Sequence, residues 1–288
     1  MKKVFSVGIT IFLAVAILVT SALCLLFFRR VGAYDYFLRQ YNEFNKTTYV
    51  PCYEDERQVR EEQYDKKALN RTLSQLKEDQ ISIFSFYSYL PDIDESGFTT
   101  EEGFITKEMA EFADLQVQKG RTFGEGDFQD TSCIPILIGD GLQRRLRLGQ
   151  KMEFSHGPKT FHTEVVGILK KGQEISNLFD IAFNLDKTYL FPISDQMIAE
   201  DFQMSDYHMF MQSAILPLNN EQDAEKVEDL LNRSGFYHVK MTRLDHLIDD
   251  FEEETIHPIK MKTAVFCLLD LLLFFLLFFH LQRRKSAI

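Results

Sequence analysis

The sequence predicts an α+β membrane protein in which two transmembrane helices flank an extracytoplasmic split α/β domain with a β-rich inserted subdomain. Three observations lead to this fold class. An almost uncharged apolar run lies near each end of the chain. The region between the runs begins and ends with segments of mixed helical and strand periodicity. Strand-like segments dominate its middle, at residues 131–195.

The first apolar run extends from Val4 to Phe28 and contains 25 residues without a charge. At 1.5 Å per residue a helix of this length spans roughly 37 Å, which exceeds a hydrocarbon layer of ~30 Å. The alternative is a cleaved signal peptide, whose apolar region has only ~7–15 residues. Leu23 also precedes Cys24 where a lipoprotein signal requires a small residue. We therefore expect a retained span.

The second apolar run, from Thr263 to Leu281, has 19 residues and one charge, Asp270. It is long enough to cross a bilayer, and a basic cluster at residues 283–285 follows it. A carboxyl group in a span costs about 2.5–3.5 kcal/mol on insertion scales, so it usually faces a partner helix or a polar cavity. We expect Asp270 to do the same.

The first run offers a surface of small and polar residues for this contact. Three of them recur at four-residue intervals and two follow further along: Ser6, Thr10 and Ala14, then Thr20 and Ser21. Small residues allow two helices to approach closely in a membrane. We expect a structural contact between this surface and Asp270. The alternative is a proton or ion relay, for which only His280 lies near.

Charge constrains the partners and the topology. Residues 31–260 hold 24 basic and 42 acidic side chains, a net charge of −18, so this region does not attract nucleic acid. The basic residues flanking the two runs slightly favour both termini inside. We expect a multi-pass protein of the cell membrane, with both termini cytoplasmic, the central domain extracytoplasmic and the lipid bilayer as its first partner.

The sequence contains few signals of cofactor or metal chemistry. No Cys/His group has zinc spacing, the segment 139–141 lacks the lysine of a phosphate loop, and no nucleophile elbow is present. We expect no enzyme activity, no cofactor and no metal site. Cys52 and Cys133 lie outside the apolar runs, and the sequence leaves open whether they form a disulfide or stay small buried residues.

The chain divides into five parts. They are transmembrane helix 1 (1–30), the first part of the α/β domain with a helical stalk (31–130), the β-rich subdomain (131–195), the second part of the α/β domain with a stalk helix (196–260), and transmembrane helix 2 with a short basic cytoplasmic tail (261–288).

Periodicity assigns the individual elements. Helical spacing continues the first span through residues 34–44 and predicts helices at 61–80, 219–235 and 243–260. Asn219 or Asn220 is a suitable N-cap for the helix at 219–235. Strands are expected at residues 81–90, 162–171, 187–193, 208–218 and 236–242.

The stretch IPILIGDGLQRRLRLGQKMEF, residues 134–154, predicts a strand, a short helix from Leu142 to Leu146, a stop at Gly149 and a second strand. Its leucines, which include Leu148, are expected to pack on the sheet. Its arginines are expected to form a solvated face, with a docking patch for a partner as the alternative.

This stretch belongs to a longer ordered pattern, formed with LQVQKGRTFGEGDF before it and FHTEVVGILKK after it. The pattern resembles the extracytoplasmic core domain of MacB/FtsX-type ABC transporter permeases. In that family a GR-x-F turn with a following Asp precedes a strand ending in Gly, a short helix, a Leu-Gly turn and a V-V-G-I strand. The matching residues are Gly120, Arg121, Phe123, Asp127, Gly139, Leu148, Gly149, Val165, Val166, Gly167 and Ile168.

The resemblance covers most of residues 1–281, but family permeases have two more spans and cytoplasmic elements that contact an ATPase. It therefore implies a permease-like protein shortened to two spans. We expect a non-enzymatic accessory or split subunit of a bacterial export or signalling assembly. Its partners would be an ABC ATPase, a full permease subunit or further copies of itself. The alternatives are a stand-alone membrane-anchored binding domain and a remnant of a truncated permease.

Overall fold

The computed structural model of the chain describes residues 2–41, 44, 48–53, 65–89, 92–93, 99–129, 132–156, 159–176, 183–234 and 238–285. The chain forms two compact units. One combines Met1–Tyr41 with Leu247–Ile288, and the other comprises Asn42–His246.

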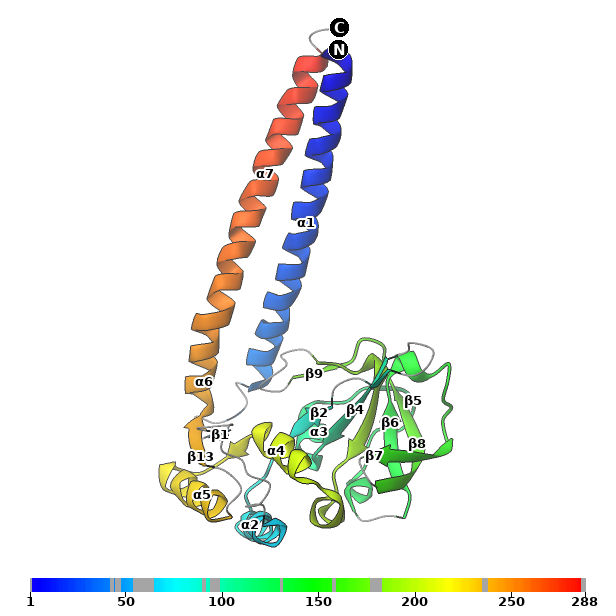
Figure 1. Cartoon of the computed structure of the whole chain (residues 1–288), viewed down its shortest axis with the longest axis vertical. Coiled ribbons are helices and arrows are strands. Elements are labelled where there is room, and N and C mark those ends of the chain that lie inside the picture. Colours follow the sequence, from blue (N-terminus) through cyan, green and yellow to red (C-terminus); the bar gives the residue numbers. More distant parts are fainter. Residues whose placement is uncertain are drawn as a thin grey trace. The chain divides into compact units, whose positions relative to one another are not determined.

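The first unit is a pair of long antiparallel helices (Figure 1). Its N-terminal member is α1 (Lys2–Tyr41). The returning arm begins within α6 (Leu244–Phe251) and continues through a π-helical segment η7 (Glu252–Ile256) into α7 (His257–Lys285). Both arms continue beyond the apolar runs, which confirms the predicted helical extensions of the two spans.

The outer surface of this helical pair is apolar. Large side chains such as Phe12, Leu18 and Phe274 are 71%, 70% and 58% exposed. The segments Gly8–Arg29 and Leu244–Arg283 are long and apolar enough to cross a membrane. A continuous apolar surface of this size is costly in water. Its natural environment is lipid, so the chain is a membrane protein.

The chain enters and leaves the second unit through neighbouring strands. β1 (Thr48–Tyr53) lies between β12 (Leu216–Pro217) and β13 (Val239–Arg243) in an antiparallel three-stranded sheet. Two amphipathic helices, α2 (Lys66–Glu78) and α5 (Glu221–Arg233), pack together beside this sheet.

The intervening chain forms an eight-stranded mixed sheet. Six strands follow the order β2-β4-β11-β6-β8-β5, while β3 pairs with β4 and β7 with β8. Their bounds are β2 (Phe86–Ser88), β3 (Asp92–Ile93), β4 (Thr99–Ile105), β5 (Val117–Gly120), β6 (Ile134–Ile138), β7 (Lys151–His156), β8 (Lys159–Leu169) and β11 (Thr188–Pro192). A separate hairpin contains β9 (Glu174–Ile175) and β10 (Phe183–Asn184).

Apolar clusters lie on both faces of the eight-stranded sheet. Successive residues of one strand point to opposite faces, so Phe104 belongs to one cluster and Ile105 to the other. Helix α3 (Lys107–Phe112) contributes Met109 to the second cluster, whereas the first continues to α2 and α5. The fold class is therefore confirmed, because two terminal helices flank an α+β domain. Its three-stranded sheet is built from strands near both ends of the globular unit, and its eight-stranded sheet from the residues between them.

The strand predicted over residues 208–218 is wrong in its first half, because residues 208–212 belong to the helix α4 (Met204–Gln212). Its buried residues Tyr207, Phe210 and Met211 recur at the three- and four-residue intervals of a helix face. The strand β12 begins only at Leu216.

The helix predicted from Leu142 to Leu146 is also wrong. The structure has a 3₁₀ segment, η4 (Asp140–Leu142), followed by turns. The N–H of Leu142 donates to Gly139 O at 3.0 Å, a hydrogen bond that spans three residues as in a 3₁₀-helix and not four as in an α-helix. So short a segment does not repay the cost of nucleating an α-helix. Leu142 and Leu146 are buried as expected, but Leu148 is 47% exposed.

The predicted boundary at residue 131 falls between β5 and β6, which belong to the same sheet. Strands β2, β4 and β5 precede this boundary and pair with strands that follow it. The inserted β-rich part therefore begins earlier in the chain than residue 131.

Candidate functional site

Asp270 makes the polar contact between the two membrane helices. Thr20 of α1 donates its hydroxyl to Asp270 Oδ1 at 2.5 Å, and Ser21 donates to Oδ2 at 2.7 Å. Thr20 is buried, whereas Ser21 and Asp270 are half-buried. Both donors are neutral hydroxyl groups, an arrangement that suits a structural helix–helix contact.

The neighbouring residues of the pair are closely packed. The sulfur atoms of Cys24 and Cys267 lie 3.5 Å apart, and the rings of Phe27 and Phe266 stack at 5.7 Å. These contacts continue the line of Thr20 and Asp270 along the two helices.

Among its described side chains, the surface named from the sequence contacts Asp270 at its C-terminal end, through Thr20 and Ser21. Thr10 and Ala14 are half-buried residues of α1, but at 1.5 Å per residue they lie about 15 and 9 Å along the helix from Thr20. Ser6 is a residue of α1 whose side chain lies outside the described part of the structure.

The matching residues of the GR-x-F turn form one local structure after β5. Gly120 has a φ of +80°, and a Cβ there would lie 2.3 Å from the Val166 carbonyl oxygen. The next residue, Arg121, donates its backbone N–H to the same oxygen at 3.1 Å. Only glycine allows this close approach to β8.

Arg121 and Asp127 close the turn through a paired contact. Arg121 Nη2 lies 2.8 Å from Asp127 Oδ1, and Nη1 also bonds the carboxylate. Burial alone would raise the pKa of Asp127, but hydrogen bonds from Arg121 and from the Gly124 N–H outweigh it and lower that pKa. Phe123 packs against the second apolar cluster and meets Phe128 edge to face at 5.5 Å.

The remaining matched glycines lie at close backbone contacts around the same strands. A Cβ on Gly139 would lie 1.9 Å from the Leu185 carbonyl oxygen, and a Cβ on Gly167 would lie 2.2 Å from the Arg121 carbonyl oxygen. The N–H of Gly149 donates to Val165 O at 2.8 Å. These contacts are structural and contain no reactive group.

A charged cluster that the sequence did not reveal lies at the end of β7. His156 Nδ1 is 2.8 Å from Glu102 Oε2 on β4, and its Nε2 is 2.9 Å from Asp206 Oδ1 on α4. Asp206 is only 2% exposed and also accepts hydrogen bonds from the Tyr89 hydroxyl and from the Gln203 N–H. The cluster therefore ties the β7–β8 hairpin to α4.

The charge of His156 follows from this environment. Burial alone would lower its pKa, but Asp206 and Glu102 outweigh burial and raise the pKa to about 9. The ring is therefore an imidazolium at neutral pH and donates through both nitrogens. His156 is 54 and 50 positions from its two partners, so no local spacing could have indicated the cluster.

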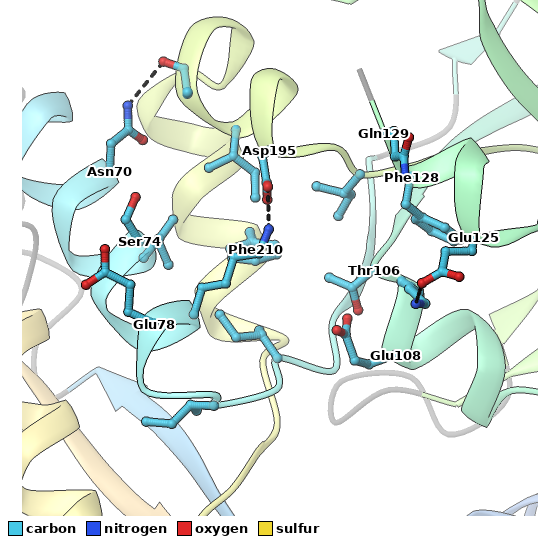
Figure 2. A pocket seen from close by; sticks show the side chains of 18 residues that line it. Asn70, Ser74, Glu78, Thr106, Glu108, Glu125, Phe128, Gln129, Asp195 and Phe210 are labelled. Carbon is cyan, nitrogen blue, oxygen red and sulfur yellow. Dashed lines mark hydrogen bonds and ion pairs between the residues drawn. The ribbon is translucent and has the colours of Figure 1, made fainter. Parts of the chain in front are cut away.

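A cleft of about 980 Å³ opens beside α2 and α4 (Figure 2). Asn70, Ser74 and Glu78 of α2 lie on one side of it, and Glu125, Phe128 and Gln129 lie on the other. Two exposed ion pairs border it: Lys77 with Asp195, and Lys107 with Glu125, whose atoms are 2.7 Å apart. This is a large concave surface, and a volume of this size is typical of ligand pockets.

Within the described ranges, no group of three or more His, Cys, Asp or Glu side chains is arranged to hold a metal ion. Cys52 and Cys133, both in that part of the chain, are half-buried and are not joined by a disulfide bond.

No protein-family model matches the sequence, and no curated protein sequence matches it. Among solved structures, the periplasmic region of MacB from Actinobacillus actinomycetemcomitans aligns with a TM-score of 0.45 and 16% identity, over 76% of this chain and 99% of that one. The extracellular domain of the noncanonic ABC-type transporter YknZ from Gram-positive bacteria aligns with a TM-score of 0.37 and 15% identity, over 68% of this chain and 99% of that one. Both TM-scores are low, and neither similarity establishes a shared fold or function.

Proposed function

We propose that this chain is a non-enzymatic, permease-like subunit of an ABC export or signalling assembly. In this role its globular unit contacts substrate or transmits motion on the extracytoplasmic side. The proposal rests first on the ordered residue pattern from Gly120 to Ile168. The matched residues Gly120, Arg121 and Gly167 meet at one junction between β5 and β8, as expected if the pattern specifies a folding unit.

The connection between the two units suits the transmission of motion. β1 and β13 pair along Tyr49–Tyr53 and Val239–Arg243, so both ends of the globular unit leave from one sheet. β13 ends at Arg243 and α6 begins at Leu244, without an intervening loop residue. The chain therefore passes directly from a strand of that sheet into the C-terminal helical arm, and this direct connection in sequence supports the proposed role.

Asp270 supports the proposal that a further membrane helix contacts the helical pair. Thr20 and Ser21 each occupy one of its oxygens, yet Asp270 remains only half-buried in the helical pair. A carboxyl group at a lipid-facing surface is costly, and contact with a further helix would relieve that cost. We propose a permease subunit associated with an ABC ATPase as this partner.

Co-purification tests the proposed assembly. The tagged full chain, extracted from native membranes in mild detergent, should carry an ABC ATPase and a permease that mass spectrometry identifies. Asp270→Leu should reduce their recovery, whereas Val265→Leu, at a residue 59% exposed on the same helix, should not. Recovery of the chain alone or only as a homo-oligomer would refute the assembly.

The proposed topology has its own test. With both termini cytoplasmic, a cysteine replacing the exposed Arg144 should react with a membrane-impermeant maleimide in intact cells. A cysteine replacing Lys3 should react only after the cells are opened. The reverse pattern would overturn the proposed orientation.

The cleft beside α2 favours a second candidate function, a membrane-anchored binding domain that acts without an ATPase. Its volume of about 980 Å³ is large enough for a ligand. Failure of the co-purification together with specific ligand binding would favour this function over the first.

A further inference from the structure

We propose that the cleft binds an organic cation with an apolar body, of the size of a drug molecule. This inference goes beyond the proposed assembly, because it concerns the ligand of the globular unit whether or not an ATPase is present. It rests on the shape of the cleft, the composition of its walls and the balance of charges around it.

The walls of this open cleft include apolar surface. Ile81, Ile83 and Ile198 line the cleft and are only partly buried, so each exposes apolar surface to it. Leu73 and Phe210 lie deeper and belong to the main core. An apolar ligand body would cover this surface and gain roughly 25 cal/mol for each Å² removed from water.

The charges around the cleft favour a positively charged ligand. Four carboxylates line it, Glu78, Glu108, Glu125 and Asp195, against two lysines. Each lysine already has a partner: Lys77 pairs with Asp195, and Lys107 with Glu125. The lining therefore carries an excess of two negative charges, and this excess resides on Glu78 and Glu108.

Glu108 is the residue most favourably placed to meet a cation. It lies in the first turn of α3, is half-buried, and forms no ion pair or hydrogen bond with its carboxylate among the described residues. Figure 2 shows it between the two sides of the cleft, next to Thr106. A partly desolvated carboxylate gains from a cationic partner, whereas an anionic ligand would be repelled.

The cation proposed here also agrees with the charge of the surrounding chain. Residues 31–260 carry a net charge of −18, which raises the local concentration of cations and excludes polyanions such as nucleic acid. The occupant therefore combines a positive group, directed at Glu108, with an apolar body against the isoleucines.

Fluorescence polarisation of rhodamine 6G, an apolar organic cation, provides the test. The full chain is placed in nanodiscs of zwitterionic lipid, and binding to empty nanodiscs is subtracted. We expect saturable binding that weakens about tenfold in Glu108→Gln and further when Glu78→Gln is added. Raising the salt concentration should weaken it as well.

The matched control is Glu111→Gln, because Glu111 lies on the same helix α3, is exposed and does not line the cleft. It should bind rhodamine 6G as the unmodified chain does, and the anionic dye fluorescein should not bind. Ile81→Thr should weaken binding without changing its salt dependence.

Three results would overturn the proposal. They are no saturable signal above empty nanodiscs, equal affinity of the Glu108→Gln and Glu111→Gln variants, and binding of a basic amphipathic peptide but not of rhodamine 6G. None of these results depends on an ATPase, so failure here is distinguishable from failure of the co-purification.

Discussion

Thr20 donates its hydroxyl to Asp270 at 2.5 Å, across the two helices that form the membrane-embedded unit. This hydrogen bond places a charged residue of one apolar helix against a polar residue of the other. It also fixes which faces of the two helices meet, because Cys24 and Cys267 follow on the same line at 3.5 Å.

Disulfide trapping tests that pairing. In a chain with Cys52→Ser and Cys133→Ser, mild oxidation with copper phenanthroline should join Cys24 to Cys267. Both thiols should then resist a polymer-linked maleimide after denaturation. The control replaces Cys24 with Ser and Leu25 with Cys, because Leu25 is 70% exposed and turns away from the partner helix. Equal protection in the two chains would show that the helices do not pair through this face.

The donors of Asp270 should stabilise the helical pair. Thr20→Val and Ser21→Ala each remove one hydrogen bond, and each is expected to cost about 1 kcal/mol of the free energy of unfolding. The midpoint of thermal unfolding in detergent measures the loss. Val19→Ala, at a residue 55% exposed on the same helix, provides the comparison. If that variant loses as much stability as the other two, the Asp270 contact is not stabilising.

Stability of the globular unit should fall as the pH rises through about 9. The pKa of His156 is about 9 in the folded chain, compared with 6.5 for an unperturbed histidine. Burial alone would lower this pKa, but Asp206 and Glu102 stabilise the charged ring and outweigh burial. The stabilisation is fully present below pH 6.5 and is lost as His156 deprotonates. The rise in pKa corresponds to roughly 3 kcal/mol, and solvent screening of the partly exposed ring reduces this stabilisation to on the order of 2 kcal/mol.

Thermal unfolding between pH 6 and 9.5 measures this loss. His156→Gln should be less stable at pH 6 and should lack most of the decline, whereas His162→Gln, at an exposed position on β8, should retain it. A decline of equal size in the His156→Gln variant would assign the pH dependence to another group.

Gly139 should tolerate no side chain. A Cβ there would lie 1.9 Å from the Leu185 carbonyl oxygen, a backbone atom that cannot move aside as a flexible side chain would. Gly139→Ala should therefore cost about 3 kcal/mol or more, or prevent folding. Gly126→Ala is the matched control, because no atom lies within 4 Å of its added Cβ. Comparable unfolding temperatures for the two variants would contradict the close approach at Gly139.

Periodicity and length predicted α1, α2, α5 and α7, because each of these helices has a signal within its own residues. The apolar runs predicted α1 and α7, and amphipathic spacing predicted α2 and α5. Of the two predicted cap residues of α5, Asn219 and Asn220, the structure uses Asn220. The strand prediction fails at residues 208–212 because a short apolar run fits a strand or a buried helix equally well. In the structure residues 208–212 form part of α4, whose side chains Phe210 and Met211 are buried in the core.

The polar contacts were harder to predict, because they join residues far apart in the chain. Asp270 was recognised as a contact residue, but its partners follow from the relative register of two helices 249 and 250 positions apart in sequence. His156 meets Glu102 and Asp206 only once β4, β7 and α4 have assembled. The cleft likewise exists only where α2 and α3 are brought together with the segment after β11.

The most direct test of the proposed assembly is photo-crosslinking in living cells from position 274. Phe274 lies one helical turn from Asp270 and is 58% exposed, so a benzophenone side chain there samples whatever contacts the helical pair in the membrane. The account predicts a crosslink to a permease that co-purifies with an ABC ATPase, and its loss in Asp270→Leu. Adducts with lipid alone, or only with a second copy of the chain, would contradict it.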